Sequence, residues 1–268
     1  MPPDRLLTYE RINKPTSTQL LFVFVSMLLT AAVVLGVPWQ HLFEPDFGER
    51  LAYTTTSIVS AETKSRINRA FVDFKRYLRR VGYQPTTEEI TIDIREEMTV
   101  NMNMLSYYDP AKRLIAIDGR YAGEPVFLYH EFMRYVLNPG RTRDHEIWAY
   151  LAIESGLAVY FPSSFVDNPR PIPTIPDLAG RRSFAELRPS LESAQTDGAE
   201  VWGSAFWEMR QKLGQNKADK LLFKCWGEFQ AADVASDQGV AFVRKLLDLD
   251  ITNQAQIRAI FTRRGMTF

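Results

Sequence analysis

Cysteine is almost absent from this sequence of 268 residues, in which Cys225 stands alone. A single thiol excludes an internal disulfide framework and a zinc site built from several cysteines. Net charge is absent as well, because 32 lysines and arginines balance 32 aspartates and glutamates. This balance argues against a nucleic-acid-binding protein that relies on bulk positive charge. The sequence also lacks a glycine-rich phosphate loop and an internal repeat.

Histidine is nearly as scarce, with only His41, His130 and His145 in the chain. Catalytic zinc sites use three protein ligands, which are usually histidines and carboxylates. Three histidines spread over the sequence therefore limit the metal chemistry that the chain can support.

The sequence has one long hydrophobic run, Leu20–Val37, which contains no charged residue. As a helix it would be roughly 27 Å long, which is enough to cross the core of a bilayer. Basic residues dominate before the run and acidic residues after it, so the positive-inside rule places the N-terminus in the cytoplasm. We predict a cytoplasmic tail at 1–19, a transmembrane signal anchor at 20–37 and a linker at 38–60. The rest of the chain is then extracytoplasmic, on the periplasmic or extracellular side. A cleaved signal peptide and a buried core helix are the alternatives.

An amphipathic helix is predicted over 61–81, ending at Gly82. One side of this helix is apolar, and the other is basic: Lys64, Arg66, Arg69, Lys75, Arg76, Arg79 and Arg80. A run of charges of this kind indicates a solvated face, or alternatively a face that contacts anionic lipid near the anchor.

Strands and then helices are predicted over the next part of the chain. Alternating isoleucines predict a half-buried strand at 90–94, and two more strands are predicted at 102–108 and 113–117. Helices are expected at 124–137 and 144–161, separated by an Asn-Pro-Gly sequence.

Prolines crowd the segment that begins at Pro162, so we predict an irregular connection over 162–183. It divides an α/β lobe, 61–161, from a helical C-terminal lobe, 184–268. Helices in that second lobe are predicted at 184–191, 199–213, 217–230, 238–247 and 254–264. The predicted fold class is α+β, with a small mixed sheet followed by a mostly helical lobe.

Two helical stretches carry the residue types of a metal site, L-Y-H-E-F-M-R-Y-V at 128–136 and A-I-E-S-G-L-A-V-Y-F at 152–161. His130 and Arg134 are four residues apart, so they project from one face of a helix, with Glu131 beside them. Zinc peptidases have H-E-x-x-H at such positions, where two histidines bind the metal and the glutamate activates water. A His-Glu pair alone is a weak signal, and a buried core histidine is the alternative.

These motifs together resemble the gluzincin-type zinc metallopeptidases, the thermolysin-like and fungalysin-like enzymes. The resemblance implies a zincin-like fold in which His130 is the first zinc ligand, Glu131 the catalytic base and Glu154 the third ligand. The chain departs from the family at Arg134, where the second histidine ligand stands. A guanidinium has only donors and stays protonated, so it does not coordinate zinc.

Three further segments are similar to gluzincin motifs. N-M-L-S-Y-Y-D-P at 103–110 resembles the edge strand that pairs with the substrate backbone, which implies cleft roles for Asn103, Tyr107 and Tyr108. Packing within the sheet is the alternative role for the two tyrosines. The tryptophan-containing segment 198–214 and the last predicted helix also resemble the family.

Arg134 is predicted to replace the charge of the metal, as a counter-ion for Glu131 and Glu154. Three interpretations remain open at this point. The chain is a membrane-anchored, non-catalytic gluzincin relative that binds a polypeptide in its cleft, with no cofactor. Alternatively, it is an active zinc hydrolase with an altered site, or an unrelated membrane-tethered helical interaction domain. None of the three involves nucleic acid.

Overall fold

A computed structural model describes residues 48–57, 59–96, 98, 105–138, 148–171, 176–229 and 239–268. Contacts divide the chain into two units, Met1–Asp46 and Phe47–Phe268, and every described residue belongs to the second unit. The predicted tail, the predicted span, the first part of the linker and Asn103 lie outside the described residues. Within those residues, no helix combines the length and the apolar character needed to cross a bilayer.

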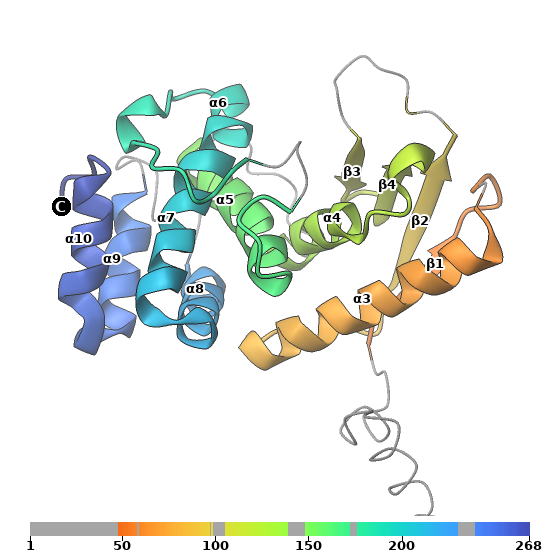
Figure 1. Ribbon diagram of the computed structural model, residues 1–268, viewed down its shortest axis with the longest axis horizontal. Helices are drawn as coiled ribbons and strands as arrows, with labels where there is room; N and C mark the ends of the chain where they lie inside the picture. The colour runs from red at the N-terminus through yellow and green to blue at the C-terminus, as the bar shows by residue number, and fades with distance from the viewer. Residues whose placement is uncertain are drawn as a thin grey trace, which may run out of the picture. The chain divides into compact units, whose positions relative to one another are not determined.

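A small mixed sheet of four strands forms the first part of the fold (Figure 1). Its strands are β1 (Arg50–Tyr53), β2 (Glu89–Arg95), β3 (Ser106–Asp109) and β4 (Leu114–Asp118), in the order β1-β2-β4-β3. The first three in this order are parallel, and β3 is antiparallel to β4. Ile90, Ile92 and Ile94 are all buried, so the strand predicted from their alternation is confirmed.

Strand β1 corrects the prediction of a linker over 38–60. Residues Arg50–Tyr53 pair with β2 in parallel register, with Leu51 opposite Ile90 and Tyr53 opposite Ile92. The Thr54 N–H then donates to the Ile92 carbonyl (2.9 Å). A strand of four residues is too short to show an alternating pattern, and its stability comes from the β2 ladder.

Helix α3 (Ala61–Val81) begins at Ser60, whose hydroxyl accepts a hydrogen bond from the Thr63 N–H (3.1 Å). It ends at Gly82, where φ is 121°, a value that glycine adopts without strain. Its apolar face is buried as predicted. Lys75 was assigned to the exposed basic face, and this is wrong: it is 1% exposed and donates to the Glu49 carbonyl (2.9 Å).

Helix α4 (Pro125–Leu137) contacts both β3 and β4 and packs on its other side against α5 (Trp148–Phe165) (Figure 1). Proline at the first position of α4 removes an N–H that would have no helical partner. Helix α5 runs on through Pro162, which corrects the prediction that the irregular connection begins there. Near its end the Ser163 hydroxyl donates to the Val159 carbonyl (2.8 Å).

The remaining chain is helical, as predicted. The predicted helix at 184–191 is wrong, because a 3₁₀ turn (Phe184–Glu186) is followed by the short helix α6 (Leu191–Gln195). The other helices are α7 (Asp197–Leu213), α8 (Gln215–Glu228), α9 (Val240–Leu249) and α10 (Gln254–Arg263). A small mixed sheet with a mostly helical second part confirms the α+β class.

Helices α5 and α7 approach closely because small residues line their contact. A Cβ atom added to Gly156 would lie 2.3 Å from the Trp202 Cβ, and one added to Gly198 would lie 2.8 Å from the Ala152 Cα. Every residue of α5 from Ala149 to Ser164 is buried. Helix α5 is therefore the central helix of the second part, and it also carries Glu154.

Candidate functional site

The predicted site begins on α4, where His130 and Glu131 adjoin the first residue of strand β3. The Ser106 hydroxyl donates to Glu131 Oε1 (2.7 Å), and His130 Nδ1 lies 2.9 Å from the same oxygen. A carboxylate only accepts, so Nδ1 is the donor in this contact. The Glu131 side chain is 4% exposed and that of His130 is 18% exposed. The glutamate is therefore buried and held from both sides.

Arg134 lies one turn further along α4, with its Nε 3.9 Å from Glu131 Oε2. Burial alone would raise the pKa of the Glu131 carboxyl. The charge and hydrogen bond of His130, the charge of Arg134 and the Ser106 hydrogen bond outweigh it, and they hold this pKa below its usual value. Glu131 is therefore an ionised carboxylate at neutral pH.

Glu154 lies on α5 and is 6% exposed. The structure brings Arg134 to Glu131 but, within the described part of the chain, forms no ion pair between Arg134 and Glu154. The Arg134 side chain is 24% exposed, so it remains partly hydrated. Its contact with Glu131 is that of a loose ion pair at the edge of the helix.

These residues do not fit a catalytic zinc site. Within the described residues, no group of three or more His, Cys, Asp or Glu side chains is placed to hold a metal ion. His130 and Glu154 would supply two ligands where catalytic zinc uses three, and Arg134, whose guanidinium only donates, stands where an H-E-x-x-H motif has its second histidine. His41 and His145 lie outside the described residues.

Strand β3 forms one edge of the sheet that the described residues build. The Leu105 carbonyl accepts from the Asp118 N–H (2.9 Å), and Tyr107 pairs with Ala116. Because hydrogen-bonded pairs alternate along an antiparallel ladder, the N–H and C=O groups of Ser106 and Tyr108 point away from β4. The strand thus presents backbone donors and acceptors along its outer edge.

The two predicted cleft tyrosines have different surroundings. The Tyr108 side chain is buried and packs edge-on against Tyr135 of α4, with ring centroids 5.9 Å apart. The Tyr107 ring lies under the guanidinium of Arg95, 5.7 Å from its centroid, and remains half-buried. Packing therefore accounts for the Tyr108 ring, and only Tyr107 offers a side chain beside the edge.

Another buried carboxylate, Asp219, was not identified from the sequence. It lies on α8 and accepts from the hydroxyls of Tyr77 on α3 (2.8 Å) and Tyr160 on α5 (2.5 Å). The Ser164 hydroxyl lies within hydrogen-bond distance of both carboxylate oxygens (2.9 and 3.1 Å), and Arg210 Nε donates to that hydroxyl (3.1 Å). Asp219 stands among apolar residues on the inner face of α8, a signal that could have identified it.

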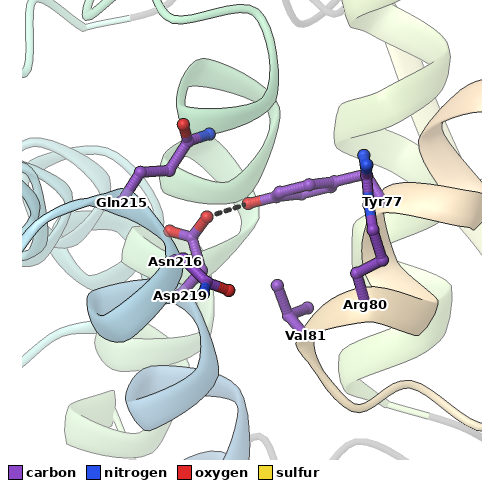
Figure 2. A pocket seen from close by; sticks show the side chains of 6 residues that line it. All are labelled: Tyr77, Arg80, Val81, Gln215, Asn216 and Asp219. Carbon is purple, nitrogen blue, oxygen red and sulfur yellow. Dashed lines mark hydrogen bonds between the residues drawn. The ribbon is translucent and has the colours of Figure 1, made fainter.

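A cavity of about 280 Å³ opens beside Asp219, between α3 and α8 (Figure 2). Its lining residues are Tyr77, Arg80, Val81, Gln215, Asn216 and Asp219. Burial raises the pKa of the Asp219 carboxyl, although the hydroxyl donors and Arg210 act in the opposite direction. Each carboxylate oxygen already has donors within the protein, so the cavity adjoins a satisfied structural network.

The chain matches no protein-family model, no curated protein and no solved structure in the comparisons. The resemblance to gluzincins therefore rests on the sequence motifs alone.

Proposed function

We propose that this chain is a membrane-anchored, non-catalytic relative of the gluzincin-type metallopeptidases, which binds a polypeptide along the edge of β3. The observation that carries the proposal is the hydrogen bond from Ser106 of this edge strand to Glu131 of α4 (2.7 Å). It brings the strand similar to the substrate-pairing strand of gluzincins to the helix with the H-E-x-x-R motif. An unrelated helical interaction domain has no need of a strand edge at that helix.

The non-catalytic part of the proposal follows from the chemistry of the site. A metallopeptidase glutamate activates a metal-bound water, and this requires a carboxylate that faces the metal. Here Glu131 Oε1 already accepts hydrogen bonds from Ser106 and His130, and Arg134 lies close to Oε2. The carboxylate is thus occupied by the protein's own donors.

The polypeptide part follows from the outer edge of β3. Backbone groups of an edge strand pair with an extended peptide and so add a strand to the sheet. Ser106 and Tyr108 present such groups, while Tyr107 lies beside them with a half-buried ring. Main-chain pairing supplies affinity without requiring a particular sequence, so the partner class is an extended polypeptide segment.

The membrane part of the proposal rests on residues 20–37, which are charge-free and flanked by basic residues on the N-terminal side. We propose that they anchor the chain as a single-pass membrane protein, with the N-terminus in the cytoplasm and residues 38–268 outside it. The polypeptide partner then reaches the β3 edge from the extracytoplasmic side.

The proposal is tested by selecting a library of random decapeptides against the full chain in detergent. The affinity of a selected peptide is then measured for Ser106→Pro and for its matched control, Ser106→Ala. Both changes remove the hydroxyl bonded to Glu131, but only proline removes the N–H at the outer edge. One lost hydrogen bond predicts about three- to tenfold weaker binding for the proline variant alone. Equal binding by the two variants, or no selected peptide, refutes the proposal.

Zinc analysis of the purified full chain tests the catalytic alternative. A non-catalytic site predicts well under one zinc per chain after dialysis, because two ligands hold the ion weakly. Tightly bound stoichiometric zinc, together with hydrolysis of casein that Glu131→Gln abolishes, favours the altered zinc hydrolase instead.

A further inference from the structure

Helix α3 carries an exposed row of arginines that nothing in the peptide-binding proposal explains. Arg66, Arg69, Arg79 and Arg80 are exposed, and Arg76, which is half-buried, lies in the same row. The helix has 21 residues and is about 30 Å long, and its opposite face is buried. Glu62 and Asp73 are the acidic residues of the same helix, so the exposed face has an excess of positive charge.

Among the residues that the structure describes, most of these arginines have no anionic partner. Arg76 bonds to Asp73 (3.3 Å), but no ion pair or hydrogen bond engages Arg66, Arg69 or Arg79 within the described part of the chain. Several basic side chains of the helical part behave differently: Arg263 and Arg264 both bond to Glu208, and Lys245 bonds to Glu228. In a chain of zero net charge, α3 thus concentrates unmatched positive charge.

Arginine is the side chain best suited to phosphate, because its planar fork donates two parallel hydrogen bonds. All five basic residues of this row, four of them exposed, are arginines, whereas the two lysines of α3 are engaged elsewhere. Lys75 is buried, and Lys64 lies over the ring of Tyr53 (5.1 Å). The chemistry of the face therefore fits phosphate groups presented on a surface.

The described chain starts next to this helix. Glu49 accepts hydrogen bonds from Lys75 of α3 through its backbone carbonyl (2.9 Å) and from the Tyr83 hydroxyl through its carboxylate. Only ten residues, 38–47, separate Gly48 from the charge-free run 20–37, and ten residues extend over at most about 35 Å. A membrane-inserted run therefore keeps α3 close to the headgroups, where weak electrostatic contacts act at high effective concentration.

We propose that the exposed arginine face of α3 docks on anionic phospholipid headgroups of the membrane in which residues 20–37 are anchored. The inference rests on the anchor of the proposed function, but not on its peptide-binding edge. Each arginine near an anionic surface stabilises the docked state by about 1 kcal/mol, which is roughly fivefold in population. Docking would fix the orientation of the rest of the unit relative to the bilayer surface.

The test uses the full chain in lipid nanodiscs made of phosphatidylcholine, with or without phosphatidylglycerol. Ser65 is exposed on the same face of α3, so an environment-sensitive dye is attached to Ser65→Cys. Cys225 is buried, and the unsubstituted chain measures its background labelling. Co-elution of the chain with neutral discs shows that the anchor is inserted, whether or not α3 docks. Quenching of the dye by a headgroup-labelled lipid shows that the arginine face lies on the membrane surface.

Docking predicts at least about twofold more quenching in anionic than in neutral discs at low salt, with the difference lost at high salt. Arg69→Glu with Arg79→Glu should abolish it, whereas the matched reversal Lys212→Glu with Lys220→Glu, at exposed positions in the helical part, should not. Equal quenching in both discs overturns the inference, even when the chain co-elutes and still binds its selected peptide. Failure to co-elute overturns the anchor and the inference together. Tight binding of a DNA oligonucleotide to the arginine face, without any lipid effect, also overturns it.

Discussion

Replacing Asp219 should affect stability more than any change in the exposed groups around it. The carboxylate is fully buried and accepts hydrogen bonds from three hydroxyls, those of Tyr77, Tyr160 and Ser164. These donors come from α3 and α5, so one side chain of α8 joins three helices that are distant in sequence.

The cost of Asp219→Ala follows from the donors that it leaves behind. A buried hydroxyl without a partner costs about 1–3 kcal/mol. Ser164 keeps its bond from Arg210, and Tyr77 lines a cavity of about 280 Å³ that is large enough to admit water. Tyr160 is fully buried and loses its partner outright. We expect a loss of about 3–5 kcal/mol in the free energy of unfolding.

The difference in stability between the parent and Asp219→Asn should also depend on pH. Burial raises the pKa of the Asp219 carboxyl in the folded chain above the ordinary value of an aspartate. The folded state therefore binds this proton more tightly than the unfolded state, and its contribution to stability declines as pH rises from about 4 through the folded pKa. Asparagine does not titrate, so Asp219→Asn should gain stability relative to the parent over this interval.

Urea unfolding of the full chain in detergent micelles, followed by tryptophan fluorescence between pH 4 and 8, measures both effects. Asp248→Asn, at an exposed aspartate of α9, is the matched control and should show no such pH-dependent gain. The raised pKa of Asp219 would be refuted if the difference in unfolding free energy between the parent and Asp219→Asn did not change with pH. It would also be refuted if the parent became more stable relative to the variant as pH rises. Parent-like stability of Asp219→Ala would refute the network itself.

Four further outcomes are expected. Arg134→Ala should lower the free energy of unfolding by only about 1 kcal/mol in urea titrations, because its 3.9 Å contact with Glu131 is partly exposed; a loss above about 3 kcal/mol would reveal a buried ion pair. Arg134→His should raise zinc affinity in competition with a chromogenic chelator, and unchanged affinity would argue against a gluzincin-like site. Gly156→Ala should cost about 1–3 kcal/mol in thermal unfolding, because its Cβ would lie 2.3 Å from that of Trp202, whereas Gly227→Ala, at an open position, should not. Protease added outside intact cells with a permeabilised outer layer should digest residues 38–268, and full protection would reverse the topology.

Local patterns in the sequence predict much of this fold. The alternating isoleucines of β2, the apolar stripe of α3 and the long helices of the second half are each visible within about twenty residues. Strand β1 could not be predicted in the same way, because its four residues form a strand only by pairing with β2. Helix α5 passes through Pro162 because its last turn is buried against other helices, and tertiary packing outweighs a local preference there.

The same distinction between local and non-local contacts applies to the candidate site. His130, Glu131 and Arg134 lie on one helix, so their spacing predicts their proximity. The partner that the sequence could not reveal is Ser106, which reaches Glu131 because β3 lies against α4. The partners of Asp219 are also non-local, at sequence separations of 142 and 59 residues for the two tyrosines. Side-chain chemistry alone does not specify such contacts.

Two buried carboxylates thus perform comparable tasks in different electrostatic settings. Glu131 has a cationic neighbour and a lowered pKa, so it remains charged and holds the edge strand β3 on α4. Asp219 accepts from neutral hydroxyls, has a raised pKa and joins α3 and α5 to α8. A polypeptide that adds to β3 would bond to the backbone of the residue whose hydroxyl holds Glu131. Such binding at the edge would be linked to the position of Glu131 through Ser106, because the glutamate of the H-E-x-x-R motif accepts the hydrogen bond of the edge strand.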